Sequence, residues 1–182
     1  MGKLEIARLG NPVLRKIAQP VNLNELSDPE SDVQVLIDDM IETMRQDGGV
    51  GLAAPQVSRS LQVVVLECDH NERYPDRESI PLTALINPVI TRYGEEKVLG
   101  WESCLSLIDF RGLVSRSQEV TVEAFDRQGK AMVIHAGGFL AVVLQHEIDH
   151  LNGKVFLDRM EDLTQLSYMK EFETYWLDHE AI

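Results

Sequence analysis

The segment Gln145–Gly153 reads Gln-His-Glu-Ile-Asp-His-Leu-Asn-Gly and contains the pattern His-Glu-x-x-His. Residues four apart on an α-helix lie on the same face, so His146 and His150 can present two imidazoles to one metal ion. Glu147 lies about 100° around the helix from His146, near enough to reach a water molecule beside that ion. Two ligands and a general base in one segment indicate a metal-dependent hydrolase.

The residues before this pattern predict that its helix is buried. Histidine and glutamate at this spacing also occur on solvated helix surfaces, where they bind nothing. Gly138–Gln145, however, is almost wholly apolar, which is typical of a helix inside a core. Two imidazoles and two carboxylates at the end of a buried helix are costly unless they are paired or bind a metal. A metal site is therefore the favoured interpretation.

Composition limits the classes of protein that need to be considered. The chain has 182 residues, which suits a single domain over residues 1–182 with a substantial core. Its formal charge of −13 argues against stable nucleic-acid binding, because a phosphate backbone requires a basic surface. No apolar run is long enough to span a membrane, and the first residues lack the apolar core of a signal peptide. We expect a cytoplasmic protein in which Cys68 and Cys104 are free, or one of them is a ligand.

The order of predicted elements indicates an α+β fold. Helices are predicted over Asn11–Ala18, from Ser27–Glu30 to Gly48, from Gly138 to Gly153, and over Asp162–Asp178. Strands are predicted at Leu61–Glu67, Leu82–Ile86, Val89–Tyr93, Glu119–Phe125 and Ala131–His135, with a hairpin turn at Asp126–Lys130 and a surface loop at His70–Glu78. The apolar stripe of the last helix is expected to pack on the domain.

A catalytic site of this kind needs a third protein ligand, and the sequence offers several. The candidates are Cys68, Cys104 and His135 upstream and Glu171, Glu173, His179 and Glu180 downstream. Composition does not choose among them. The surroundings of Cys104 are the more suitable, because Glu102–Ser106 interrupts a strand-like region with small polar residues. Cys68, at a strand end, equally suits an inert buried thiol.

A stretch of small residues, Gly49–Gln56, has two interpretations. It is either a flexible connector, or a backbone that must lie close to a ligand or metal. Together with Glu102–Ser106 and Gln145–Gly153, it resembles the three motifs of the peptide deformylases, in that family's order and with similar spacing. Arg8–Arg15 also resembles the family's N-terminal region. Ser103 departs from the family's usual glycine, and Leu107-Ile108 stands where x-Pro is usual.

The resemblance implies antiparallel β-sheets packed around a central metal-binding helix, with N-terminal helices and a C-terminal helix. It implies Cys104, His146 and His150 as ligands of one divalent ion. It also implies that this ion would be Fe2+ in the cell, with Zn2+, Ni2+ or Co2+ able to occupy the site. Glu147 would activate water for attack on the formyl group of an N-formyl-methionyl peptide, releasing formate. The Gln56 amide and the Leu105 backbone N–H would stabilise the developing oxyanion.

The resemblance also implies a substrate pocket. Its candidate residues are Val50, Gly51, Ser103, Arg111, Phe139, Val142 and Val143, and for Val142 and Val143 ordinary core packing is an equal alternative. The peptide would lie as an added strand beside Val50-Gly51 and the residues near Ser103. Arg116 is expected to pair with Glu102 or Asp149 and so to orient the ligands.

The implied partners are N-formyl-methionyl nascent polypeptides, with transient ribosome proximity and a monomeric state. Some relatives dock through a basic C-terminal extension, whereas Glu161–Ile182 is acidic with one Lys and no Arg, so that mode is not supported here. Two rival hypotheses are less favoured. One is a zinc endopeptidase with Glu171 or Glu173 as third ligand. The other is a protein that is not an enzyme, with a structural metal site or as an inactive relative with a binding role, and an intact Glu147 and Gln56 argue against it.

Overall fold

The computed structural model describes residues 2–68 and 78–177 and combines helices with antiparallel sheets. Within these residues the α-helices are α1 (Asp32–Gln46), α2 (Gly138–Leu151) and α3 (Met169–Tyr175). The strands are β1 (Gly51–Ala53), β2 (Val63–Cys68), β3 (Ile80–Tyr93), β4 (Lys97–Glu102), β5 (Phe110–Ser117), β6 (Glu119–Phe125), β7 (Ala131–Gly137) and β8 (Leu166–Tyr168). The predicted α+β class is confirmed.

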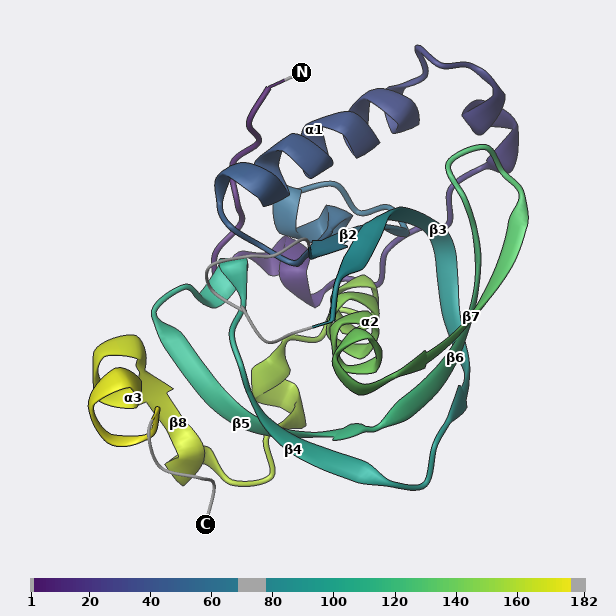
Figure 1. Ribbon diagram of the computed structural model, residues 1–182. Coiled ribbons are helices and arrows are strands. Elements are labelled where there is room, and N and C mark those ends of the chain that lie inside the picture. Colours follow the sequence, from purple (N-terminus) through teal and green to yellow (C-terminus); the bar gives the residue numbers. More distant parts are fainter. Residues whose placement is uncertain (1, 69–77, 178–182) are drawn as a thin grey trace.

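The strands form two antiparallel sheets around α2. The larger sheet has the order β1-β2-β3-β6-β7 and the smaller one the order β4-β5-β8. In Figure 1, α2 runs through the middle of the molecule with the strands wrapped around it, and α1 covers the larger sheet from outside. The expected arrangement of sheets around a central helix is therefore present.

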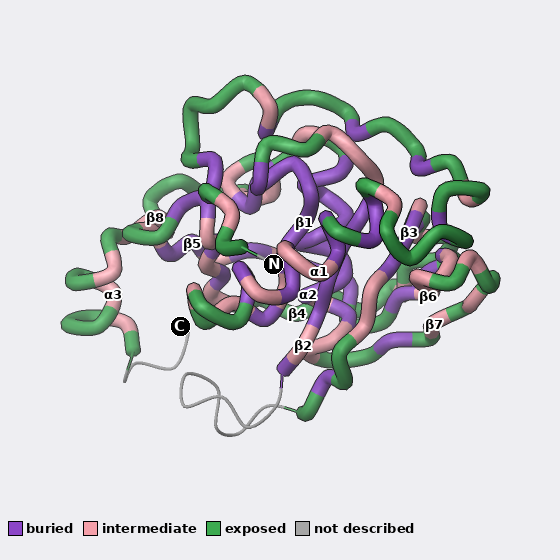
Figure 2. The backbone as a smooth tube through the Cα atoms, turned by 90° about the horizontal axis from the view of Figure 1, so that it is seen from above, coloured by how far each residue is buried: buried purple, intermediate pink, exposed green. Residues whose placement is uncertain are grey.

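Strand β2 explains why α2 sits at the centre. Successive side chains of a strand point to opposite faces, and both faces of β2 are buried. Val64 and Leu66 pack in one apolar cluster with Leu144 of α2, whereas Val65 packs in a second cluster with Met40 of α1. Each of these five residues is at most 1% exposed. Figure 2 shows the same burial along the inner strands and α2.

Strand β3 is one long strand where the sequence predicted two, Leu82–Ile86 and Val89–Tyr93. It continues through Asn87 and Pro88, and its register against β6 shifts at that point. Asn87 adopts a left-handed φ of 51°, and its side chain accepts a hydrogen bond from the Val21 N–H (2.8 Å) and donates one to the Val21 carbonyl (3.0 Å). This tie to a distant segment stabilises the irregularity within a continuous strand.

The two N-terminal helix predictions were too long. The Asn11–Ala18 segment forms only the 3-10 turn Pro12–Arg15, capped by Asn11 as expected. The longer helix does not open at Ser27–Glu30 but at Asp32, because Ser31 is the N-cap and its hydroxyl accepts a hydrogen bond from the backbone of the first turn.

The predicted C-terminal helix is present as α3, but the predicted range Asp162–Asp178 was too long. The described part of this segment forms a 3-10 turn at Leu163–Gln165, then β8 and only then α3. Pairing of β8 with β5 overrides the helical spacing of the apolar residues. No residue of α3 is fully buried, but Phe172 and Trp176 are half-buried and pack against Trp101 of β4, so the expected packing on the domain is present in part.

The sequence did not predict strand β5, which is the central strand of the smaller sheet. Residues 70–77 of the predicted surface loop lie outside the described residues. None of the described helices has the length and apolar character needed to cross a membrane.

Candidate active site

The buried C-terminal half of α2 and the loop after β4 bring three potential metal ligands together. His146 and His150 come from successive turns of α2, and Cys104 lies between β4 and the 3-10 turn Leu105–Leu107. One ligand atom from each lies within 4.8 Å of the others, and Cys104 Sγ is 3.3 Å from His150 Nε2. Among the described residues, no other group of three such side chains meets this criterion.

The donor set fits a tetrahedral divalent ion. Sulfur and nitrogen ligands bound at about 2.0–2.3 Å lie roughly 3.3–3.8 Å from one another, which the observed spacing allows. Burial alone would raise the pKa of the Cys104 thiol. The His150 and His146 imidazoles outweigh burial and hold the Cys104 pKa well below its usual range. A thiolate with a low pKa is the form of cysteine that binds metals.

The other candidates for a third ligand lie elsewhere. Cys68 is buried at the end of β2, and His135 is exposed on β7, where its ring lies 3.2 Å from the Thr121 hydroxyl. Glu171 and Glu173 are exposed on α3. His179 and Glu180 lie outside the described residues.

A buried ionic network holds the His146 ring. Glu102 accepts hydrogen bonds from His146 Nδ1 (2.7 Å) and from Arg116 Nε (2.7 Å) and Nη2 (3.1 Å). Arg116 Nη1 also donates to Asp149 (2.6 Å), so the expected pairing of Arg116 is confirmed with both carboxylates. Although burial opposes ionisation, the hydrogen bonds from His146 and Arg116 lower the pKa of Glu102 to about 2. Sequence reasoning missed Arg159, which donates twice to Asp149.

Glu147 is 4% exposed, and its Oε2 has no hydrogen-bond partner among the described residues. Burial raises the pKa of its carboxyl group above the usual value, against the lowering effect of the two imidazoles. The backbone of Gly51 lies directly against this side chain. A Cβ at Gly51 would fall 2.4 Å from Glu147 Oε1. The backbone of the small-residue segment is therefore in close approach at Gly51, but to the Glu147 side chain and not to the ligand or metal that one of the two interpretations proposed.

Hydrogen bonds fix the orientation of the Gln56 amide. Its Oε1 accepts the Ala53 N–H (2.8 Å), so Nε2 must point the other way. Nε2 lies 3.4 Å from Cys104 Sγ and 3.3 Å from Ser106 Oγ. Gln56, which is 1% exposed, thus directs an N–H donor at the potential metal ligands.

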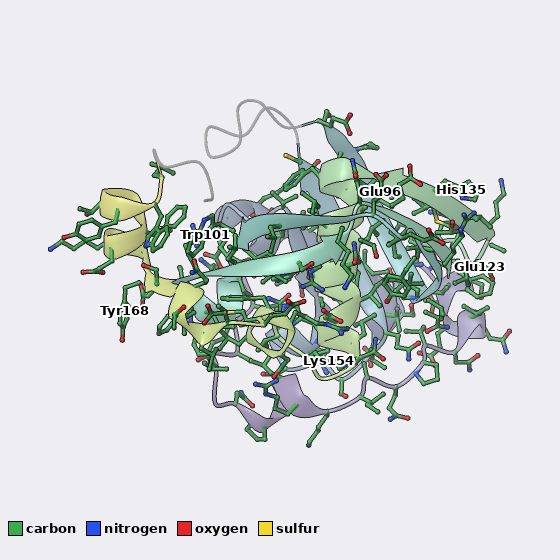
Figure 3. The ribbon with its side chains drawn as sticks, turned by 90° about the horizontal axis from the view of Figure 1, so that it is seen from below. Glu96, Trp101, Glu123, His135, Lys154 and Tyr168 are labelled. Atoms are coloured by element: carbon green, nitrogen blue, oxygen red, sulfur yellow. The ribbon has the colours of Figure 1, made fainter. Side chains whose placement is uncertain are left out.

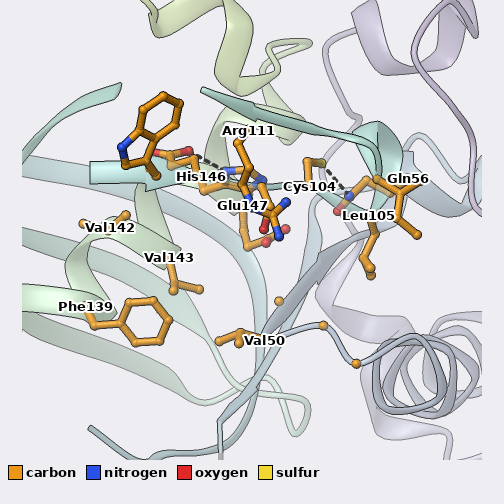
Figure 4. A pocket seen from close by; sticks show the side chains of 17 residues that line it. Val50, Gln56, Cys104, Leu105, Arg111, Phe139, Val142, Val143, His146 and Glu147 are labelled. Carbon is orange, nitrogen blue, oxygen red and sulfur yellow. Dashed lines mark hydrogen bonds and ion pairs between the residues drawn. The ribbon is translucent and has the colours of Figure 1, made fainter. Parts of the chain in front are cut away.

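A cavity of about 110 Å³ opens beside these groups. Its lining includes every candidate substrate-binding residue, namely Val50, Gly51, Ser103, Arg111, Phe139, Val142 and Val143, together with Gln56, Cys104, Leu105, His146 and Glu147. Figure 4 shows the apolar side chains of Val50, Phe139 and Val143 on one side of Glu147, with Gln56 and Leu105 on the other. Val143 also belongs to the core cluster, so it packs in the core and lines the cavity.

Sequence reasoning did not identify Trp101 and Ile108, which also line the cavity. Their only signal in the sequence is their position beside the Glu102–Ser106 segment. Trp101 lies near the end of β4. Side chains alternate between the two faces of a strand, so the direction of the Trp101 side chain depends on the extent of β4, which the sequence did not predict.

Comparisons with known proteins agree with this geometry. The family model for polypeptide deformylase matches residues 3–166. Peptide deformylase 2 of Pseudomonas putida is 46% identical over 90% of this chain and 91% of its own length. Peptide deformylase 1 of Bordetella pertussis is 44% identical over 90% of each chain. The Met-Ala-Ser-bound structure of a class I type b peptide deformylase from Acinetobacter baumannii has a TM-score of 0.82, is 40% identical, and covers 87% of this chain and 98% of its own.

The His-Glu-x-x-His helix, the cysteine beside it and the match over most of the chain agree with one another. The chain therefore belongs to the polypeptide deformylase family and is a metal-dependent hydrolase that removes the N-formyl group from the N-terminal formyl-methionine of newly synthesised proteins.

Proposed function

We propose that Cys104, His146 and His150 hold the metal of this deformylase and that Glu147 is its general base. One observation carries the proposal. A thiol and two imidazoles converge within 4.8 Å, next to a buried carboxylate whose Oε2 has no partner among the described residues. Unpaired buried oxygens are costly, and such atoms persist at sites where a ligand or reactant completes their hydrogen bonding.

We propose ferrous iron as the metal in the cell, with zinc, nickel or cobalt able to replace it in purified protein. Nitrogen and sulfur ligands accept each of these ions, so the donor set is compatible with all four. When bound, the ion lowers the pKa of a water molecule and polarises the formyl carbonyl.

In the proposed mechanism, Glu147 accepts a proton from the attacking water and later returns it to the leaving amine. Gln56 Nε2 donates a hydrogen bond to the oxyanion that develops on the formyl oxygen. Leu105 is the first residue of a 3-10 turn, so its backbone N–H has no partner within that turn and is the second proposed donor. Both donors are fixed before substrate binds, so little reorganisation is needed during the reaction.

The lining of the cavity supports the proposed substrate contacts. Phe139, Val142 and Val143 with Val50 form the apolar surface that we propose for the methionine side chain. β1 and β4 are edge strands of their sheets, so each has one unpaired side on which a peptide strand can form backbone hydrogen bonds. We propose that the substrate lies there, beside Gly51 and Ser103, with Arg111 donating to its backbone.

We further propose that residues 1–182 act as a single domain and as a cytoplasmic monomer, near the ribosome only transiently. The shared packing of both sheets around α2 supports one domain. The acidic C-terminal residues do not support a basic docking extension.

The two cysteines offer a matched test of the metal site, because both are buried and free of disulfides. The Cys104→Ala variant, purified without oxygen, is expected to bind less than one tenth of an equivalent of metal and to release no formate. Removal of a group that only hydrogen-bonds to a ligand already lowers metal affinity about 10- to 100-fold, and removal of a ligand should lower it further. Cys68→Ala should keep both metal and activity. Full metal content in Cys104→Ala would overturn the assignment and favour a ligand elsewhere.

A further inference from the structure

The C-terminal segment is fixed to the strands that build the substrate cavity. Residues 167–177 follow the end of the family-model match at residue 166 and form most of β8 and all of α3. β8 pairs with β5 through Arg111↔Ser167 and Phe110↔Tyr168, and the Met169 N–H donates to the Asp109 carbonyl (2.8 Å). The start of α3 is therefore tied to the strand that carries Arg111.

An aromatic cluster then joins α3 to β4. The ring of Trp101 lies 5.0 Å from that of Phe172 and 5.5 Å from that of Trp176, in tilted orientations. Phe172 lies in α3 and Trp176 is the C-cap residue that follows it. The Trp176 N–H donates to the Phe172 carbonyl (2.9 Å), which keeps the two residues one turn apart. The Arg111 guanidinium lies 6.0 Å from the centre of the Phe172 ring. Figure 3 shows Trp101 in the direction of α3.

Trp101 and Arg111 line the cavity, whereas no residue of α3 does. Among the described residues, Trp101 and Arg111 are the cavity-lining side chains whose ring or guanidinium packs against Phe172 or Trp176. A helix of seven residues is not stable by itself in water, so α3 depends on the pairing of β8 and on its contacts with Trp101 and Arg111. The same contacts limit the freedom of both side chains. Aromatic pairs at these distances contribute beyond the area they bury, and a guanidinium over a ring is attracted to its face.

From this geometry we propose that Phe172 and Trp176 are positioning residues for peptide binding. They hold the Trp101 indole and the Arg111 guanidinium so that these groups bind the residues that follow formyl-methionine. The indole offers an apolar face for a substrate side chain, and the guanidinium offers N–H donors to backbone carbonyls. The proposal rests on the proposed function of this same cavity, and it predicts a preference for extended peptides over formyl-methionine alone.

Kinetics on two substrates test the role of α3. In Phe172→Ala, KM for formyl-Met-Ala-Ser should rise about fivefold to tenfold with kcat within about twofold, because only uniform substrate binding is lost. KM for formyl-methionine amide should not change, since this substrate does not reach Trp101 or Arg111. Phe172→Tyr should keep the KM of the unchanged protein, because it keeps the ring. Tyr175→Ala, an exposed residue of the same helix, is the matched control and should have no effect.

A binding measurement tests the same point without catalysis. The chain has two tryptophans, so Trp176→Phe leaves Trp101 as the sole one while keeping a ring at position 176. Addition of the product Met-Ala-Ser should change the emission of Trp101. Adding Phe172→Ala in this background should weaken that binding about fivefold to tenfold.

An unchanged KM for formyl-Met-Ala-Ser in Phe172→Ala would overturn the positioning role. So would an equal rise in KM for both substrates, or no response of Trp101 to Met-Ala-Ser. Failure of the proposed function would look different, because the unchanged protein would then release no formate from either substrate.

Discussion

At the level of single residues, the position of Glu147 depends on the absence of a side chain at Gly51. The Cβ of an alanine at this position would lie within 2.8 Å of three atoms of the Glu147 side chain. Real Cβ atoms do not approach so closely, and the contact is with the carboxylate that we propose as base. The glycine therefore leaves room for the Glu147 side chain, and its φ is not one of the positive values that favour glycine.

Gly51→Ala is expected to lower kcat for formate release by about 100-fold, the loss that a displacement of about 1 Å in a catalytic group can cause. Gly100→Ala is the matched control, because a Cβ at Gly100 on β4 meets no atom within 4 Å. Steady-state kinetics of both variants would check this. Equal activity of the two variants would show that Glu147 does not depend on Gly51.

The pH dependence of the reaction follows from burial of Glu147. Burial raises the pKa of this carboxyl group, so it stays protonated to a higher pH than an exposed glutamate. A protonated carboxyl cannot act as a base, and kcat/KM should therefore fall as the pH drops through this raised pKa. The pH–rate profile is expected to show an acidic limb with an apparent pKa above about 4.3, the value of free glutamate. Constant activity down to about pH 4 would contradict this assignment.

At the level of elements, the ionic network formed by Glu102, Arg116 and Asp149 joins β4 and β5 to α2. All three side chains are at most 8% exposed. Breaking a buried ion pair by removing one partner leaves its other charges uncompensated, which is more costly than losing a pair at the surface. The same network holds His146 through Glu102, so it connects the stability of the fold to the geometry of the metal site.

Arg116→Met is expected to lower the free energy of unfolding by about 3–5 kcal/mol. Arg45→Met breaks an ion pair with Glu67 in which half of the Arg45 side chain is exposed, and should cost at most about 1 kcal/mol. Urea unfolding of both variants would measure the difference. Similar losses in the two would show that the buried network contributes no more than a surface pair.

The sequence predicts an element well when residues within that element determine its structure, and poorly when pairing with distant residues determines it. α2 was predicted correctly from the apolar run within it. The β6–β7 hairpin was predicted correctly from the alternation of its strands and the turn between them. β5 and β8 were missed because their pairing joins residues far apart in the chain. The packing of Trp101 against Phe172 and Trp176 could not be predicted either, because it depends on the position of α3 beside β4, which no local pattern reveals.

At the level of the whole molecule, the metal site joins separate parts of the chain. Cys104 packs with the smaller sheet and the segment around Phe156, whereas α2 packs with the larger sheet. A bound ion would therefore connect two apolar clusters. Only the native state places the three ligands together, so metal binding must stabilise the native state relative to the unfolded chain.

Removal of the metal with a chelator is expected to lower Tm. At free metal 100-fold above its Kd, binding contributes about 2.7 kcal/mol, which is a shift of several degrees for a chain of this size. Cys104→Ala should show no further decrease with chelator, whereas Cys68→Ala should respond as the unchanged protein does. Thermal melts with and without chelator would measure this, and equal Tm values in the unchanged protein would contradict a linking role for the ion.

The most direct test of the central claim is formate release from formyl-Met-Ala-Ser by iron-loaded protein without oxygen, with Glu147→Ala measured alongside. The unchanged protein should release one formate for each free Met-Ala-Ser formed. Glu147→Ala should keep its metal and lose at least about 100-fold in kcat, as expected when a general base is removed. No formate from the unchanged protein, or full activity in Glu147→Ala, would contradict the account.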